Sequence, residues 1–309
     1  MSSKPSDPVI EALTLREVFA LLWSGKWLVL ATAFGVTLLT IFWALSLPNI
    51  YRSEALLSPN QQEQTGGLSD FASRYGGLAS LAGFSVNDLA NNDVAIGLET
   101  LKSRRFISSF IAKHDILVQL MAAKDWNAET RVLEIDANVY NADTETWTRS
   151  VSPPLTVTPS DLEAHRAFLE ILDVDEKGSD GLVRISVEHV SPDIASQWVA
   201  WLIEDLNAVI RLKDIAEAER AISYLESQIQ ETSVAELRNV FFSLIEQQTQ
   251  TVMLAKISEE YFLRTIDPPV APDYKDRPGR TVIVILGGLL GGTLGIAIVL
   301  LIAVFRRAT

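Results

Sequence analysis

Two uninterrupted apolar runs lie near the two ends of the chain and enclose a long stretch in which apolar and polar residues alternate. The runs cover residues 27–47 and 281–305, which are 21 and 25 positions without a charge. Because an α-helix rises about 1.5 Å per residue, about 20 apolar residues cross a hydrocarbon core about 30 Å thick. The pattern therefore predicts two transmembrane helices, with residues 48–280 forming a domain between them.

The first run has a second interpretation, a cleaved signal peptide, because residues 44–46 loosely resemble a cleavage site. Signal peptides have a shorter apolar region and usually a shorter leader than this run, which follows 26 residues. Trp23, Trp27 and Trp43 lie near the ends of the run, where interfacial aromatic residues are common. An uncleaved membrane anchor is therefore the better interpretation.

Charge near the runs predicts how the protein is oriented in a membrane. Two spans place both termini on one side, and five basic residues flank the outer ends of the runs: Lys4, Arg16, Lys26, Arg306 and Arg307. The positive-inside tendency assigns segments 1–26 and 306–309 to the cytoplasm and the domain between the spans to the periplasm. Lys275, Arg277 and Arg280 oppose this assignment, but long domains cross membranes regardless of their charge.

The domain between the runs begins with strand and helix patterns. Alternation predicts strands over 51–57 and 182–189, whereas residues 60–92, rich in Gly, Ser, Asn and Gln, indicate loops with short helices. An amphipathic helix is expected over 93–113. It would bury five residues: Val94, Leu98, Leu101, Phe106 and Phe110. The expected fold class is an α+β membrane protein, in which two transmembrane helices flank a periplasmic α/β base domain with a long projecting helical hairpin.

A long helical region, about 192–265, follows the second strand. Ser191 can cap the first helix, and Pro192 suits its first position. Apolar residues then recur at helical spacing, with no proline or glycine to interrupt them: Ala195, Trp198, Leu202, Leu206, Val209, Leu212, Ala216, Ile222, Leu225 and Ile229. A helix of about 40 residues is about 60 Å long.

The helical pattern restarts after residues 231–233. Ser233 and Glu236 have the spacing of a capping box, and a second helix is expected to continue through Tyr261. We expect an antiparallel hairpin, with one continuous kinked rod as the alternative. A hairpin covers only part of each apolar stripe, so neighbouring copies in an oligomer are the simplest cover, and an intramolecular core is the alternative.

Composition and charge narrow the function. The formal net charge is −13 for the chain and −15 for residues 48–280, so the domain would repel nucleic acid. Cysteine is absent, and adjacent carboxylates such as 204–205 and 259–260 are more typical of a solvated helix face than of a glycosidase. Three histidines lack metal-ligand spacing and are expected at the surface or in hydrogen bonds: His114, His165 and His189. We expect no catalytic residue, no cofactor and no metal.

The second run contains glycines four positions apart. Three G-x-x-x-G pairs overlap, and they use Gly287, Gly288, Gly291, Gly292 and Gly295. Each pair lies on one side of a helix, where the absence of side chains lets another backbone approach closely. A phosphate-binding loop would need exposed backbone N–H groups, which a membrane span does not offer. The glycines are therefore predicted to form a helix-packing surface.

A proline-rich segment, 267–280, precedes this span. It contains five turn-forming residues: Pro268, Pro269, Pro272, Pro278 and Gly279. From Pro269 the chain follows P-x-x-P, then four residues, Arg277-Pro278-Gly279, eleven residues and G-G-x-x-G. This pattern resembles the signature of the polysaccharide co-polymerases, the Wzz-type chain-length determinants, P-x-x-P-x(4)-S-P-K followed by G-G-x-x-G. Arg277 replaces the serine and Gly279 the lysine, and Arg280 supplies a basic group one residue later.

The resemblance implies an inner-membrane protein of a Gram-negative bacterium that regulates the chain length of lipopolysaccharide O-antigen. Such proteins form ring-shaped homo-oligomers and act with a Wzy-type O-antigen polymerase on the nascent lipid-linked polysaccharide, without catalytic residues of their own. Because four residues follow Phe305, we expect the class without a fused cytoplasmic kinase domain.

Three alternatives remain open at the level of the sequence. A co-polymerase for enterobacterial common antigen or exopolysaccharide would share nearly every feature. A chemoreceptor-like periplasmic sensor has two spans and a helical domain, although a cytoplasmic output module is expected of it. A membrane-anchored glycosidase is the enzymatic alternative.

Overall fold

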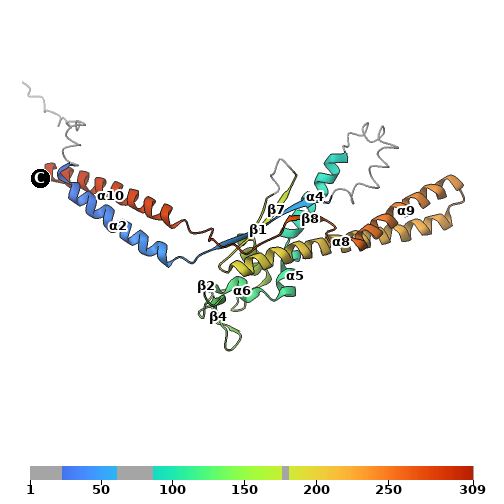
Figure 1. The fold of residues 1–309 in the computed structure, drawn as a ribbon, viewed down its shortest axis with the longest axis horizontal. Coiled ribbons are helices and arrows are strands. Elements are labelled where there is room, and N and C mark those ends of the chain that lie inside the picture. Colours follow the sequence, from blue (N-terminus) through green and yellow to red (C-terminus); the bar gives the residue numbers. More distant parts are fainter. Residues whose placement is uncertain (1–22, 61–85, 176–180, 309) are drawn as a thin grey trace, which may run out of the picture. The chain divides into compact units, whose positions relative to one another are not determined.

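A computed structural model describes residues 23–60, 86–175 and 181–308 of the protein (Figure 1). The chain divides into two compact units. One unit combines Met1–Asn49 with Asp276–Thr309, and the other is Ile50–Lys275.

The first unit is a pair of apolar helices, α2 (Lys26–Ser46) and α10 (Arg280–Ala308), which lie side by side (Figure 1). Their mean hydropathy reaches 2.2 and 2.5, and both are long and apolar enough to cross a membrane. The helices coincide with the two charge-free runs of the sequence, so the two candidate spans are brought together in one helix pair.

The second unit contains a four-stranded antiparallel sheet with the order β6-β7-β1-β8. Its strands are β1 (Tyr51–Pro59), β6 (Leu172–Asp175), β7 (Val183–His189) and β8 (Leu263–Asp267). The predicted strands over 51–57 and 182–189 are confirmed as β1 and β7. Ala55 pairs with Ile185 and Leu57 with Val183, so alternation places their side chains on the same buried face.

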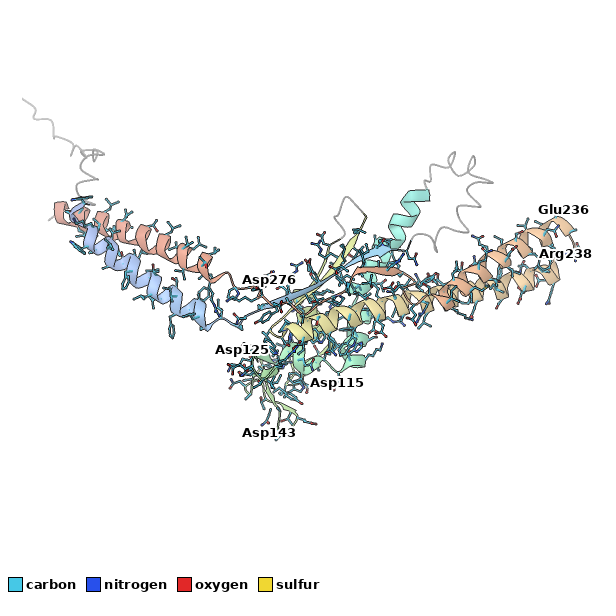
Figure 2. The ribbon with its side chains drawn as sticks, in the orientation of Figure 1. Asp115, Asp125, Asp143, Glu236, Arg238 and Asp276 are labelled. Carbon is cyan, nitrogen blue, oxygen red and sulfur yellow. The ribbon has the colours of Figure 1, made fainter. Side chains whose placement is uncertain are left out.

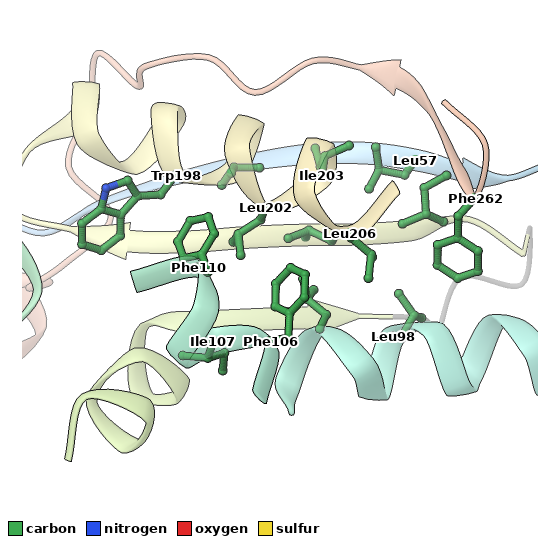
Figure 3. Close-up of a cluster of buried hydrophobic side chains, with 14 of the residues drawn as sticks. Leu57, Leu98, Phe106, Ile107, Phe110, Trp198, Leu202, Ile203, Leu206 and Phe262 are labelled. Carbon is green, nitrogen blue, oxygen red and sulfur yellow. The ribbon is translucent and has the colours of Figure 1, made fainter. Parts of the chain in front are cut away.

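The helix α8 (Pro192–Glu231) packs its first half against the sheet. Trp198, Leu202 and Leu206 are fully buried there. Phe106 and Phe110 belong to the same buried cluster as Trp198, Leu202 and Leu206 of α8 (Figure 3). The core therefore forms from one face of the sheet, one face of α8 and the shorter helices that precede it in the chain.

The helix expected over 93–113 is two helices, α4 (Val86–Lys102) and α5 (Arg104–His114). Ser103 separates them because its side chain accepts a hydrogen bond from the backbone N–H of Phe106, as an N-cap does. All five residues predicted on the apolar face are buried, so that face was predicted correctly. The prediction of one continuous helix was wrong. Most of the loop region expected over 60–92 lies outside the described residues.

Residues 115–171 carry short elements that periodicity did not predict. They are α6 (Leu117–Met121), β2 (Ala123–Asn127), β3 (Val132–Ile135), β4 (Tyr140–Asn141), β5 (Thr146–Trp147) and α7 (Asp161–Ile171). Ser160 and Glu163 form a capping box at α7, and Arg149 binds Glu163 through two guanidinium nitrogens, at 2.8 and 3.0 Å. This ion pair joins the loop after β5 to the start of α7.

The helices α8 and α9 (Ala235–Ile257) form an antiparallel hairpin, so the hairpin is confirmed and the continuous rod is wrong. Lys256 lies 3.7 Å from Glu219 across the hairpin, and Arg211 donates to the backbone carbonyl of Ser258 at 3.2 Å. Figure 2 places Glu236 and Arg238 at the end of the hairpin farthest from the sheet.

Two details of the predicted helical region are wrong. The residue that caps α9 is Val234, without a side-chain hydrogen bond, so Ser233 and Glu236 do not form the predicted capping box. The second helix ends at Ile257 instead of Tyr261, and β8 begins at Leu263 inside the stretch expected to be helical. The chain leaves the helix there because it returns to the sheet edge beside β1.

Candidate functional site

The helix α10 contacts α2 through glycines at every fourth position. A Cβ atom built on Gly291 would lie 2.9 Å from the Cα of Ala33, and one on Gly295 would lie 2.8 Å from the Cα of Val29. Gly287, one turn earlier, would collide with a threonine side chain of α2. Only glycine leaves enough space for the two helix backbones at this separation.

The other two glycines of the stretch have different surroundings. A Cβ on Gly288 would have one ordinary contact, 3.4 Å from the hydroxyl oxygen of Thr37. A Cβ on Gly292 would have no described atom within 4 Å apart from its chain neighbours and the backbone of its own helix. The five glycines therefore do not share one surface, because three lie against α2 and Gly292 faces away from any neighbour in the described structure.

Threonines supply the facing surface on α2. The hydroxyl of Thr37 donates to the carbonyl of Ala33 at 2.7 Å, and Thr40 donates to Thr37 at 2.9 Å. Thr32 donates in the same way to carbonyls one turn earlier. Because these hydroxyls bond within their own helix, small polar side chains occupy an apolar contact without an unpaired donor. The spacing of Thr32, Thr37 and Thr40 is a signal that could have been read from the sequence.

Arg280 links the start of α10 to the end of α2. Its Nε donates to the carbonyl of Ala44 at 3.0 Å, and its Nη2 donates to the carbonyl of Leu47 at 3.2 Å. The last carbonyls of a helix lack partners within the helix and carry the negative end of its dipole, so a guanidinium satisfies both requirements. The basic residue that stands one position late in the sequence motif is therefore the residue that joins the two apolar helices.

The proline-rich segment connects β8 to α10 without helix or extended pairing over residues 268–272. The carbonyl of Val270, between Pro269 and Pro272, accepts a hydrogen bond from the Ser53 hydroxyl of β1 at 2.8 Å. Gly279 begins the turn into α10, because its carbonyl accepts from the backbone N–H groups of Val282 and Ile283. The motif residues thus lie along one connection.

A buried amide fixes the base of the hairpin. The Asn207 side chain donates to the carbonyls of Ile203 and Leu263, at 3.1 and 3.0 Å. Its oxygen accepts from the backbone N–H groups of Phe262 and Leu263, at 2.7 and 2.9 Å. One side chain of α8 therefore holds the strand that returns from α9, an arrangement that sequence periodicity did not indicate.

Asp205 corrects the prediction that residues 204–205 form a solvated acidic pair. Glu204 is exposed, but Asp205 is buried and accepts hydrogen bonds from Lys113 at 2.5 Å and from His114 at 2.9 Å. This hydrogen bond to Asp205 raises the pKa of Lys113. The His114 ring stacks on Trp201 with centroids 4.1 Å apart.

The other two histidines also form hydrogen bonds, as expected. His165 contacts the carbonyl of Lys102 at 3.0 Å, and His189 contacts that of Gln119 at 3.1 Å. Burial lowers the pKa of His189, which favours its neutral form. Among the described residues, no group of three or more histidine and carboxylate side chains could hold a metal ion.

Comparison with protein families gives a match over the first third of the chain. Residues 11–114 match the family model described as Wzz, chain length determinant protein. Over these residues the chain is similar to that family. The matched segment contains α2, β1, α4 and α5, and it ends at the last residue of α5. The proline and glycine motif lies beyond this segment, so the family match and the motif are separate observations.

Two solved structures resemble the chain at low identity. A structure described as a full-length bacterial polysaccharide co-polymerase has 18% identity and a TM-score of 0.40, covering 95% of this chain and 99% of its own. A fragment of WzzB, polysaccharide co-polymerase from Salmonella Typhimurium, has 14% identity and a TM-score of 0.30, covering 74% and 100%. No curated protein sequence matches the chain.

Proposed function

We propose that the chain is a membrane-bound co-polymerase that regulates the length of a bacterial polysaccharide. The observation that carries this proposal is the match of residues 11–114 to the chain length determinant family. Two helices suited to a membrane and a long helical hairpin support it, because they agree with what the sequence motif implies for this family. The role is regulatory, and synthesis of the polymer belongs to a separate polymerase.

The polysaccharide we propose is lipopolysaccharide O-antigen, and the partner is a Wzy-type polymerase in the inner membrane. In this proposal segments 1–26 and 306–309 are cytoplasmic and residues 48–280 are periplasmic. The basic residues outside the two spans favour that orientation, and the acidic domain disfavours nucleic acid as a partner.

We further propose a homo-oligomeric ring in which neighbouring hairpins cover one another. Several large apolar side chains of the hairpin are exposed in a single copy: Tyr224, Val234, Leu237, Val240, Phe242, Met253 and Ile257. Exposed apolar residues that recur along one element favour association. The ring would confine the polymerase at the membrane, while the chamber above it influences how long the growing glycan stays engaged.

The experiment that tests this function is a comparison of all surface polysaccharides in a strain that lacks the protein. We expect O-antigen to lose its preferred length while its synthesis continues, and the other polysaccharides to be unchanged. A changed length of enterobacterial common antigen or exopolysaccharide, with normal O-antigen, would assign the protein to that polymer. Normal lengths of all three would contradict the proposal and favour a sensor.

A further inference from the structure

A hollow between α5 and α8 is unlike the rest of the acidic domain. It has a volume of about 630 Å³, within the usual range for small-molecule sites of about 300–1,000 Å³. Three cationic side chains line it, Arg105, Lys113 and Lys213, against one carboxylate, Asp205. Residues 48–280 carry a net charge of −15, so this local excess of positive charge runs against the domain as a whole.

Two of the three cations have no ion-pair partner among the described residues. Lys113 forms an ion pair with Asp205, so the one carboxylate of the hollow is neutralised by Lys113. The side chains of Arg105 and Lys213 are exposed and form no hydrogen bond or ion pair with any residue in the described ranges. The hollow therefore keeps about two positive charges available to a ligand.

The position of Arg105 in its helix is a second reason to expect an anion in the hollow. Arg104 and Arg105 occupy the first turn of α5, which contains no acidic residue. Positive side chains are unfavourable at the positive end of a helix dipole, so the sequence places two cations where the helix itself would favour anions. Arg105 also lines a second hollow of about 590 Å³ beside the start of α7, together with Arg104 and Asp161.

Apolar side chains form the remaining wall of the first hollow. Phe106 and Phe110 of α5 are buried at its base, whereas Val209 and Leu212 of α8 are 42% and 63% exposed beside it. Uncompensated cations next to exposed apolar surface match a ligand with an anionic head and an apolar body.

We propose that this hollow binds an amphipathic phosphate, with the phosphate at Arg105 and Lys213 and an attached hydrocarbon chain against Val209 and Leu212. The guanidinium offers paired N–H donors to phosphate oxygens, and the ammonium adds a compact charge. This inference does not depend on which polysaccharide the protein regulates, because its test measures binding and not polymer length.

The test is calorimetric titration of the full-length protein, in nanodiscs of neutral phosphatidylcholine, with hexyl phosphate. Inorganic phosphate and hexanol are the two comparison ligands, since each carries one half of the proposed chemistry. We expect saturable binding of hexyl phosphate that is at least about tenfold tighter than binding of either half.

Three variants locate the site. Replacing both cations, Arg105→Ala with Lys213→Ala, should weaken hexyl phosphate binding at least about tenfold, because charged hydrogen bonds are lost. Leu212→Ser should weaken hexyl phosphate binding and leave inorganic phosphate binding unchanged. Arg166→Ala, on the exposed side of α7, removes a charge elsewhere and should change neither.

Four results would overturn the proposal. The wild type could show no saturable binding of hexyl phosphate, or it could bind inorganic phosphate as tightly as hexyl phosphate. Arg166→Ala could lose as much affinity for hexyl phosphate as the double variant, or the double variant could change oligomeric state but still bind hexyl phosphate. The last result would identify the hollow as a contact between copies. The charge substitutions are at exposed positions, and the far-UV spectrum of each variant verifies that it is folded.

Discussion

At the scale of single residues, the fold depends on polar side chains that bind backbone groups at the ends of elements. Asn207, Arg280, Ser103 and Glu163 all have this role. Helix and strand ends leave backbone donors and acceptors unpaired, so one side chain there can determine where the chain turns. Such residues have no periodicity, and for this reason a search for apolar repeats overlooks them.

Asn207→Ala should destabilise the protein strongly. The substitution leaves the buried N–H groups of Phe262 and Leu263 without an acceptor, and we expect a loss of about 2–4 kcal/mol in the free energy of unfolding. Urea unfolding followed by tryptophan fluorescence measures it, because Trp198 and Trp201 lie on the same helix. Asn239→Ala, at an exposed site on α9, is the matched control and should change stability by less than about 0.5 kcal/mol. Equal effects of the two substitutions would show that Asn207 does not hold β8.

The lowered pKa of Glu163 gives the folded protein a stability that depends on pH. The Arg149 guanidinium, followed by the Ser160 backbone N–H, lowers the pKa of Glu163 from 4.5 to about 2. A lowered pKa in the folded state contributes stability that is complete above pH 4.5 and is lost as the pH falls toward about 2. The wild type should therefore be more stable than Glu163→Gln at neutral pH, and the difference should narrow across this interval. A difference that stays constant from pH 5 to pH 2 would contradict the assignment.

At the scale of elements, the sequence predicted those with a repeating apolar pattern. The strands β1 and β7 and the helix α8 each keep one apolar face over several residues, so their type followed from periodicity. The break at Ser103 did not follow, because the apolar repeat continues across it on both sides. The strand β8 did not follow either, since its conformation is imposed by β1 and Asn207 and not by its own pattern.

The candidate site was predicted in part. The proline and glycine residues drew attention to the connection into α10, but spacing alone could not say which glycines meet another helix. That distinction depends on the rotation of α10 against α2, which is determined by the threonines of α2 and by Arg280. The unpaired cations beside α5 were also missed, because Arg105 and Lys213 are far apart in sequence.

Gly291 and Gly292 are neighbours in α10 with different surroundings, so substitutions at these two positions form a matched pair. Gly291→Leu inserts a side chain where even a Cβ would lie 2.9 Å from the α2 backbone, so it should force the helices apart. Gly292→Leu places the same side chain where even the Cβ would have no described atom of α2 within 4 Å. We expect Gly291→Leu to lower the thermal midpoint of the detergent-solubilised protein by several degrees and Gly292→Leu to leave it nearly unchanged.

The variants Gly291→Leu and Gly292→Leu also distinguish two possible roles of α10 in length control. If close approach of α2 and α10 is what the glycines provide, only Gly291→Leu should broaden the distribution of polysaccharide lengths in cells. If Gly292 contacts a neighbouring copy or the polymerase, Gly292→Leu should broaden it without a change in thermal stability. Normal length distributions in both variants, with the proteins inserted, would exclude a role for helix packing in length control.

At the scale of the whole molecule, the two compact units have separate physical tasks. The α2–α10 pair is apolar on nearly all sides, whereas the second unit carries the sheet, the hairpin and most of the acidic charge. In the proposed function the protein holds and confines a polymerase, a role that requires no catalytic residues of its own. The hairpin and the membrane pair are therefore the parts through which length control would operate.

The most direct measurement of this account is the length distribution of lipopolysaccharide on a gel, in a strain that lacks the protein and in the same strain supplied with it. Without the protein, we predict a smooth decrease of polymer abundance with length. With the protein restored, we predict a cluster of bands around one preferred length and an unchanged total amount of polymer. An identical ladder in both strains, with the restored protein present in the inner membrane, would contradict the claim that this chain regulates O-antigen length.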